Sequence, residues 1–110
     1  MVTGYIKAVP DNAIFYQGDI RDEKFLNELF QNEKINAVIH FAAFSLVGES
    51  VVNPLKYYEN NLYGTKVLLD AMIKNGVNKI VFSSTAATYG EPENIPILES
   101  DRTCPTNPYG

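Results

Sequence analysis

The sequence predicts an α/β fold in which a parallel sheet is doubly wound by helices. The strand signals are three short apolar runs, at residues 13–16, 37–41 and 79–83. Each run is continuous rather than alternating, which is typical of parallel strands that are covered on both faces. Helical patterns separate the runs, so the expected order of elements is β-α-β-α-β. We therefore expect three strands and two main helices.

The first helix is predicted to follow the strand at 13–16. Asp22 suits its N-cap, because the side-chain oxygen of an aspartate can accept a bond from a free backbone N–H of the first turn. Leu26, Leu29 and Phe30 then fall on one face of the helix. The spacing thus predicts an amphipathic helix that begins directly after Asp22.

The second helix is predicted over residues 54–75. Pro54 suits the first helical position, where its missing N–H costs nothing, and Gly76 suits the left-handed residue after the helix end. A loop rich in proline and glycine follows the third strand, from residue 88 to residue 110. The predicted apolar stripe of this helix consists of Leu55, Tyr58, Leu62, Leu69, Met72 and Ile73.

Composition and charge exclude several classes of function. The chain has 110 residues, of which 45% are hydrophobic, and its net charge is −4 with no run of Lys or Arg. This balance argues against disorder, a nucleic-acid partner and an anionic-membrane surface. One cysteine, Cys104, and one histidine, His40, leave no zinc site and no Ser-His-Asp triad. We expect a cytoplasmic chain with no metal and no membrane span.

Ligands of parallel sheets bind at the carboxyl ends of the strands. The three predicted strands are followed by Asp19, by the pair Ala42 and Ala43, and by the hydroxyl cluster 83–85. The carboxylate can accept hydrogen bonds from a ligand, the alanines let a ligand approach the backbone, and the hydroxyls can bind a substrate. Each also has a purely structural interpretation, as a loop carboxylate, a tight strand–loop junction or a turn motif.

Three further polar residues lie within predicted elements. His40 is inside an apolar strand, where a core histidine with a hydrogen-bond partner is the favoured interpretation over a catalytic one. Asn60 and Asn61 lie within the second helix, where asparagine is mildly unfavourable. We expect one of them to direct its amide toward the ligand edge, with surface exposure as the alternative.

Five motifs in order resemble those of one family. They are GDIRD at 18–22, HFAAFSLVGESV at 40–51, YYENN at 57–61, FSSTAATYG at 82–90 and NPYG at 107–110. Each motif is weak alone, but the ordered set covers essentially the whole chain. It resembles the UDP-glucose 4-epimerases, members of the extended short-chain dehydrogenase/reductase superfamily. The segment at 47–50 favours the epimerases over the related dehydratases.

The resemblance implies NAD as cofactor and a set of residues that contact it. Asp19 and Ile20 match the pair at the adenine end, and Ser83 matches a hydroxyl near the nicotinamide. The remaining matches to cofactor-binding residues are Phe41, Ala42, Ala43 and Asn60. No metal is implied.

The resemblance also implies the catalytic residues Thr85 and Tyr109. Thr85 matches the residue that hydrogen-bonds the 4-hydroxyl of the sugar, and Tyr109 matches the catalytic tyrosine of a Tyr-x-x-x-Lys motif. In the implied reaction, UDP-glucose and UDP-galactose interconvert through a 4-keto intermediate. A free tyrosine, with a pKa near 10, is a poor base at pH 7, and the lysine of the motif favours its phenolate form.

The family's phosphate-binding glycine turn and the lysine of that motif are not found within residues 1–110. The resemblance therefore implies a partial Rossmann-like NAD-binding domain over 1–110, without the first glycine-rich βαβ unit and without a substrate domain. We expect the isolated chain to bind NAD weakly or not at all and to be inactive. With two strands of the full order missing, we expect the remaining three to close into one sheet, or the chain to oligomerise.

Two alternatives to the epimerase prediction remain. The first is another NAD-dependent nucleotide-sugar enzyme, such as a dehydratase. The second is a non-catalytic α/β binding or assembly module. In the family the helix that matches residues 54–75 forms part of a dimer interface, so the resemblance also implies a homodimer.

Overall fold

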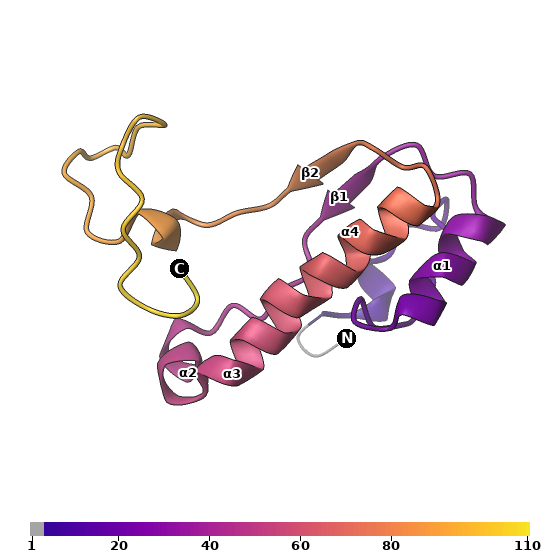
Figure 1. Ribbon diagram of the computed structural model, residues 1–110, viewed down its shortest axis with the longest axis horizontal. Helices are drawn as coiled ribbons and strands as arrows, with labels where there is room; N and C mark the ends of the chain where they lie inside the picture. The colour runs from indigo at the N-terminus through magenta and orange to yellow at the C-terminus, as the bar shows by residue number, and fades with distance from the viewer. Residues whose placement is uncertain (1–3) are drawn as a thin grey trace.

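The structure is a computed structural model that describes residues 4–110. Two parallel strands and a long broken helix form its centre, and α1 packs beside that helix (Figure 1). The elements in order are the 3-10 helix η1 (Ile6–Ala8), α1 (Glu23–Asn32), β1 (Val38–His40), α2 (Val47–Val52), α3 (Pro54–Tyr57), the π-helical η2 (Tyr58–Tyr63), α4 (Gly64–Lys74), β2 (Ile80–Phe82) and the 3-10 helix η3 (Ala86–Tyr89).

β1 and β2 form a parallel pair. Val38 lies opposite Ile80, and His40 lies opposite Phe82. Backbone bonds extend the pair at both ends, from Val38 N to Lys79 O at 3.0 Å and from Ser83 N to His40 O at 3.0 Å. The second and third predicted strands are thus confirmed, each shortened to three residues.

The predicted strand at 13–16 is wrong. These residues form no strand, and Ile14 is 72% exposed. A strand exists only when a neighbour supplies the other half of its hydrogen-bond ladder, and the sheet of the described residues contains only β1 and β2. The α/β class and the parallel sheet are confirmed, but the expected closure of three strands into one sheet does not occur.

α1 follows the prediction closely. The Oδ1 atom of Asp22 accepts the N–H of Phe25 at 3.1 Å, which is an N-cap bond. Leu26 and Phe30 are buried, and Leu29 is half-buried. The local signals of cap and periodicity therefore sufficed to define this helix.

The second predicted helix begins at Pro54 as expected, and Gly76 follows its end with φ of +70°. It is interrupted by the π-helical turn η2. Its predicted apolar stripe is wrong except for Met72, because the other five residues are exposed. A π turn holds more residues than an α turn, so it shifts which face of the helix meets the core. The buried residues are Tyr57, Gly64, Val67, Leu68, Ala71 and Met72.

The core lies between α1, α4 and one face of the sheet. Its buried members are Leu26, Phe30, Val67, Leu68, Ala71, Met72 and Val77. The other face of the sheet is open, since Ile39 is 62% and Val81 63% exposed. Among residues 4–110, no helix is both long enough and apolar enough to span a bilayer.

Candidate functional site

A cavity of about 160 Å³ lies where the segments after β1 and β2 meet the chain end. Of the residues predicted to form the site, it is lined by Ala42 and Ala43 after β1, by Ser83 and Thr85 after β2, and by Tyr109. These residues come from three segments that are far apart in the sequence. The structure therefore brings both predicted catalytic residues together with three of the predicted cofactor residues.

Asn61 holds the segment after β1 against the helix. Its Oδ1 atom accepts the N–H of Phe44 at 2.8 Å, and its Nδ2 donates to Phe44 O at 2.9 Å. Asn60 Nδ2 also donates to Asn61 Oδ1, at 2.9 Å. Because one residue supplies both the donor and the acceptor to Asn61, the orientation of the amide is fixed. Asn61 lines the cavity, whereas Asn60, the residue that matches the cofactor-contacting asparagine, does not.

A buried histidine supports the helix side of the cavity. The hydroxyl of Thr65 donates to Asn61 O at 2.6 Å, so it accepts from His40 Nε2, which lies 2.9 Å from it. His40 is thus protonated at Nε2. It is 4% exposed, and burial lowers its pKa below the usual 6.5. The interpretation of His40 as a core histidine with a hydrogen-bond partner is confirmed.

Thr85 is held through its side-chain hydroxyl, and Tyr109 through its backbone N–H and its ring. The hydroxyl oxygen of Thr85 accepts the N–H of Ala87 at 3.2 Å and caps η3. This leaves the hydroxyl proton of Thr85 free to donate into the cavity. Tyr109 donates its backbone N–H to Ser50 Oγ at 3.3 Å, and its ring meets the ring of Tyr57 edge-on.

Four predicted cofactor residues lie outside the cavity lining: Asp19, Ile20, Phe41 and Asn60. The carboxylate of Asp19 accepts from the guanidinium of Arg21, with Nη2 2.7 Å from Oδ2, and this contact lowers the pKa of Asp19. Ile20 packs so closely on Gly64 that a Cβ on the glycine would lie 2.8 Å from Ile20 Cδ1. Phe41 is 76% exposed. In this structure the carboxylate of Asp19 is thus paired with Arg21.

Sequence reasoning missed four residues at the site. Thr65 and Thr88 line the cavity, and Ser50 and Tyr57 contact Tyr109. Thr65 lies four residues after Asn61 on the same helix face, a spacing that could have indicated it. Nothing local marks Ser50 or Tyr57, because their partner is more than 50 residues further along the chain.

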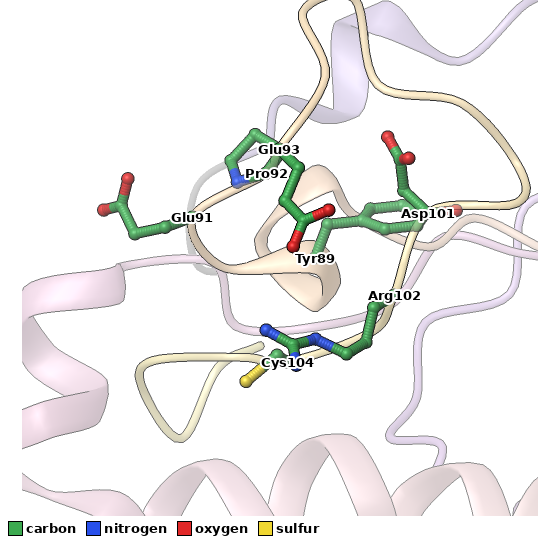
Figure 2. Close-up of a pocket in the computed structure, with 7 residues that line it drawn as sticks. All are labelled: Tyr89, Glu91, Pro92, Glu93, Asp101, Arg102 and Cys104. Carbon is green, nitrogen blue, oxygen red and sulfur yellow. The ribbon is translucent and has the colours of Figure 1, made fainter.

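A second hollow, of about 20 Å³, lies within the C-terminal loop (Figure 2). It has room for little more than one water molecule. Its lining consists of Tyr89, Glu91, Pro92, Glu93, Asp101, Arg102 and Cys104. None of these is a predicted site residue. Across residues 4–110, no group of three or more His, Cys, Asp and Glu side chains is placed to bind a metal.

Comparison with known proteins relates this chain to nucleotide-sugar enzymes. The family model described as GDP-mannose 4,6 dehydratase matches residues 3–110. A UDP-glucose 4-epimerase of Lacticaseibacillus casei is 59% identical over 110 residues, which are 100% of this chain and 33% of that protein. One from Streptomyces lividans is 59% identical over 109 residues, covering 98% of this chain and 33% of that protein. This chain thus spans about a third of the length of the curated relatives it matches.

Solved structures give the same result. The structure of the Bifidobacterium longum UDP-glucose 4-epimerase in complex with NAD⁺ and UDP is 52% identical, with a TM-score of 0.83. The match covers 86% of this chain and 28% of that one. Another UDP-glucose 4-epimerase crystal structure has a TM-score of 0.93 at 52% identity, over 96% of this chain and 32% of its own. The local fold described above is therefore shared with this group of enzymes.

Proposed function

Because this chain belongs to the GDP-mannose 4,6 dehydratase family, we propose that it forms the catalytic edge of an NAD-dependent UDP-hexose 4-epimerase. The observation that carries the proposal is the shared cavity of Thr85 and Tyr109, bordered by Ala42, Ala43 and Ser83. The epimerases of L. casei and B. longum support this choice within the family. The proposed interconversion is between UDP-glucose and UDP-galactose.

In the proposed reaction, Tyr109 and Thr85 act on the same substrate hydroxyl. The hydroxyl of Tyr109, as phenolate, removes the proton from the 4-hydroxyl of the sugar. The hydroxyl of Thr85 already accepts from Ala87 N, so it donates its own proton to the substrate oxygen. A free tyrosine has a pKa near 10, so phenolate at pH 7 requires positive charge nearby. The two side chains thus divide the roles of base and orienting donor.

The residues at this edge fit one end of NAD. Ala42 and Ala43 are exposed and carry only methyl side chains, so a flat ring can approach their backbone. A cavity of about 160 Å³ is smaller than the usual site for a whole drug-sized ligand, so it suits a single ring. We propose that Ser83 contacts the nicotinamide end, and that Asp19, Ile20, Phe41 and Asn60 bind the cofactor along its length. When bound, NAD⁺ supplies a hydride acceptor and a positive charge.

A chimeric enzyme tests the proposal directly. The 110 residues replace the matching stretch of the L. casei epimerase, with the unmodified L. casei enzyme as the control. We expect the chimera to interconvert UDP-galactose and UDP-glucose without a change in product mass. A product that has lost water would instead identify a dehydratase. An inactive, folded chimera would favour the non-catalytic alternative.

For the isolated 110-residue chain we propose no turnover and weak or no NAD binding. The reason is that the described cavity offers contacts to one end of the cofactor only. Calorimetry with NAD and an assay with UDP-galactose are the measurements. Micromolar binding or measurable turnover would contradict this expectation.

We also propose a homodimer through the face of the long helix that the chain leaves uncovered. The exposed apolar residues of this face are Leu55, Tyr58, Leu62, Leu69 and Ile73. They lie along α3, η2 and α4, and none of them belongs to the core cluster. An apolar stripe of this length is typical of an association surface, and a second copy offers the same stripe in return.

A further inference from the structure

The two largest fully buried side chains, Ser50 and Tyr57, lie beside Tyr109 rather than in the apolar core cluster. Among the described residues, Ser50 is 0% and Tyr57 2% exposed. Neither belongs to the core cluster between α1 and α4. Burying a hydroxyl without a hydrogen-bond partner is unfavourable. The partners of these two hydroxyls therefore indicate which contacts the buried side chains stabilise.

Ser50 lies on α2, and its hydroxyl both donates and accepts a hydrogen bond. Its proton goes to Val47 O at 2.6 Å. With the proton committed there, the hydroxyl oxygen accepts the backbone N–H of Tyr109 at 3.3 Å. The contact joins residues 59 positions apart in the sequence, and it fixes the backbone of Tyr109 at the edge of the cavity.

Tyr57 lies at the end of α3 and supports the side chain of Tyr109. The two rings are edge-on, with centroids 6.5 Å apart and planes at 89°. The hydroxyl of Tyr57 donates to Glu49 Oε2 at 2.9 Å and accepts the N–H of Leu46 at 3.1 Å. Lys56 Nζ lies 2.5 Å from the second oxygen of Glu49. These bonds tie the hydroxyl of Tyr57 to Leu46 and Glu49 and fix the position of its ring beside Tyr109.

We propose that Ser50 and Tyr57 are positioning residues that hold the backbone and ring of Tyr109 in the orientation its reaction requires. The inference rests on the proposed role of Tyr109 as the base. Tyr109 lies in a loop outside any helix or strand, so regular secondary structure does not fix it. A displacement of a reacting group by about 1 Å can lower a rate by about a hundredfold, which makes such external support consequential.

Substitution of Ser50 in the L. casei chimera tests the backbone contact. We expect Ser50→Ala to lower kcat by about ten- to a hundredfold with little change in KM, because the substrate still binds but meets a displaced base. Ser100→Ala, at an exposed serine in the C-terminal loop, is the matched control and should leave kcat unchanged. A Ser50→Ala variant with the kcat of the parent would overturn the proposal.

A double-mutant cycle separates positioning from general loss of structure. Tyr109→Phe keeps the ring and the backbone N–H but removes the base. In that background, Ser50→Ala should have little further effect on the residual rate, because the group it positions is already lost. Equal losses from Ser50→Ala in both backgrounds would assign Ser50 a structural role only. Tyr57→Phe, which keeps the ring but frees it from Glu49, should give a smaller loss that follows the same pattern.

Hydrogen exchange at the Tyr109 amide tests the same contact without any activity. In the 110-residue chain, we expect Ser50→Ala to accelerate exchange of this amide at least about tenfold, while the Gly110 amide, which donates to Asn107, stays unchanged. Unchanged exchange at Tyr109 would also overturn the proposal. An inactive parent chimera would instead contradict the proposed epimerase function, and the exchange result would still decide whether Ser50 holds Tyr109.

Discussion

At the scale of single residues, the donors and acceptors around the cavity are matched atom by atom. The hydroxyl of Thr65 accepts a hydrogen bond from His40 Nε2 and donates one to Asn61 O. The amide of Asn61 bonds both the N–H and the C=O of Phe44. Each group therefore has one orientation that satisfies its neighbours. This series of hydrogen bonds links His40, at the end of β1, to the loop that lines the cavity. A substitution of His40 is therefore expected to alter the position of that loop.

His40 should make stability depend on pH between about 5.5 and 7.5. Burial lowers its pKa in the folded state, so below the ordinary 6.5 the unfolded chain binds a proton more readily than the folded chain. Its contribution to stability is complete above pH 6.5 and is lost as the pH falls toward the folded pKa. We expect the urea midpoint to be lower at about pH 5.5 than at about pH 7.5, and His40→Gln to flatten this difference.

His40 is the only histidine, so the test is specific. Its ring-proton NMR signal should titrate with a midpoint below 6.5. A midpoint at or above 6.5 would contradict the burial argument.

Thr85→Ala and Tyr109→Phe should lower turnover far more than stability in the chimera. In the proposed reaction each hydroxyl contacts the 4-hydroxyl oxygen of the sugar, so its removal is expected to lower kcat by about a hundredfold or more. Both side chains are only half-buried, so the melting temperature should change by no more than a few degrees. Ser100→Ala serves as the matched control. Equal losses of activity and melting temperature would contradict the assigned roles.

At the scale of elements, the sequence predicted correctly those helices whose caps and apolar spacing involve neighbouring residues. α1 was predictable because its cap bond from Phe25 N to Asp22 and its apolar spacing lie within a few residues of each other. The run at 13–16 carried the same apolar signal as β1 and β2. Whether it becomes a strand depends on a neighbouring strand, and a strand signal by itself contains no information about its partner.

The site was predictable in part, for the same reason. Parallel strands place their following loops at one edge, and this rule correctly brought Ala42, Ala43, Ser83 and Thr85 together. The π turn η2 could not be predicted from periodicity, because it changes the period itself. The contact of Ser50 with Tyr109 depends on how a 59-residue segment folds back, which no local pattern encodes.

The shifted face of the long helix gives a prediction at this scale. Leu68 is 5% exposed, and Leu55, which the period-based stripe placed in the core, is 77% exposed. Leu68→Ala should therefore destabilise the 110-residue chain by about 2–5 kcal/mol. Leu55→Ala, the matched control, should change stability by less than about 0.5 kcal/mol. Urea denaturation of both variants is the measurement, and similar midpoints would contradict the observed helix face.

At the scale of the whole molecule, the chain exposes more surface than its length requires. Its accessible surface is 8459 Å², against about 6,100 Å² expected for a folded monomer of this size. Its radius of gyration is 16.0 Å, against about 13 Å for a compact domain of this length. The C-terminal loop extends to one side of the helices (Figure 1), and one sheet face and one helix face stay open. The chain spans about a third of the length of its curated relatives, and these open faces are available for further contacts.

The uncovered helix face makes the proposed dimer testable in the 110-residue chain. Leu62 lies near the middle of the exposed stripe and is 64% exposed, so Leu62→Glu leaves the core unchanged. Burying one leucine contributes about 1.5–3 kcal/mol and the symmetric interface buries it twice, so the variant should raise the dimer Kd at least about a hundredfold. Sedimentation velocity over a concentration series measures this Kd. Gln31→Glu adds the same charge at an exposed position on α1 and should leave the Kd unchanged. A monomeric parent chain, or a dimer that Leu62→Glu does not weaken, would show that the stripe does not bind a second copy.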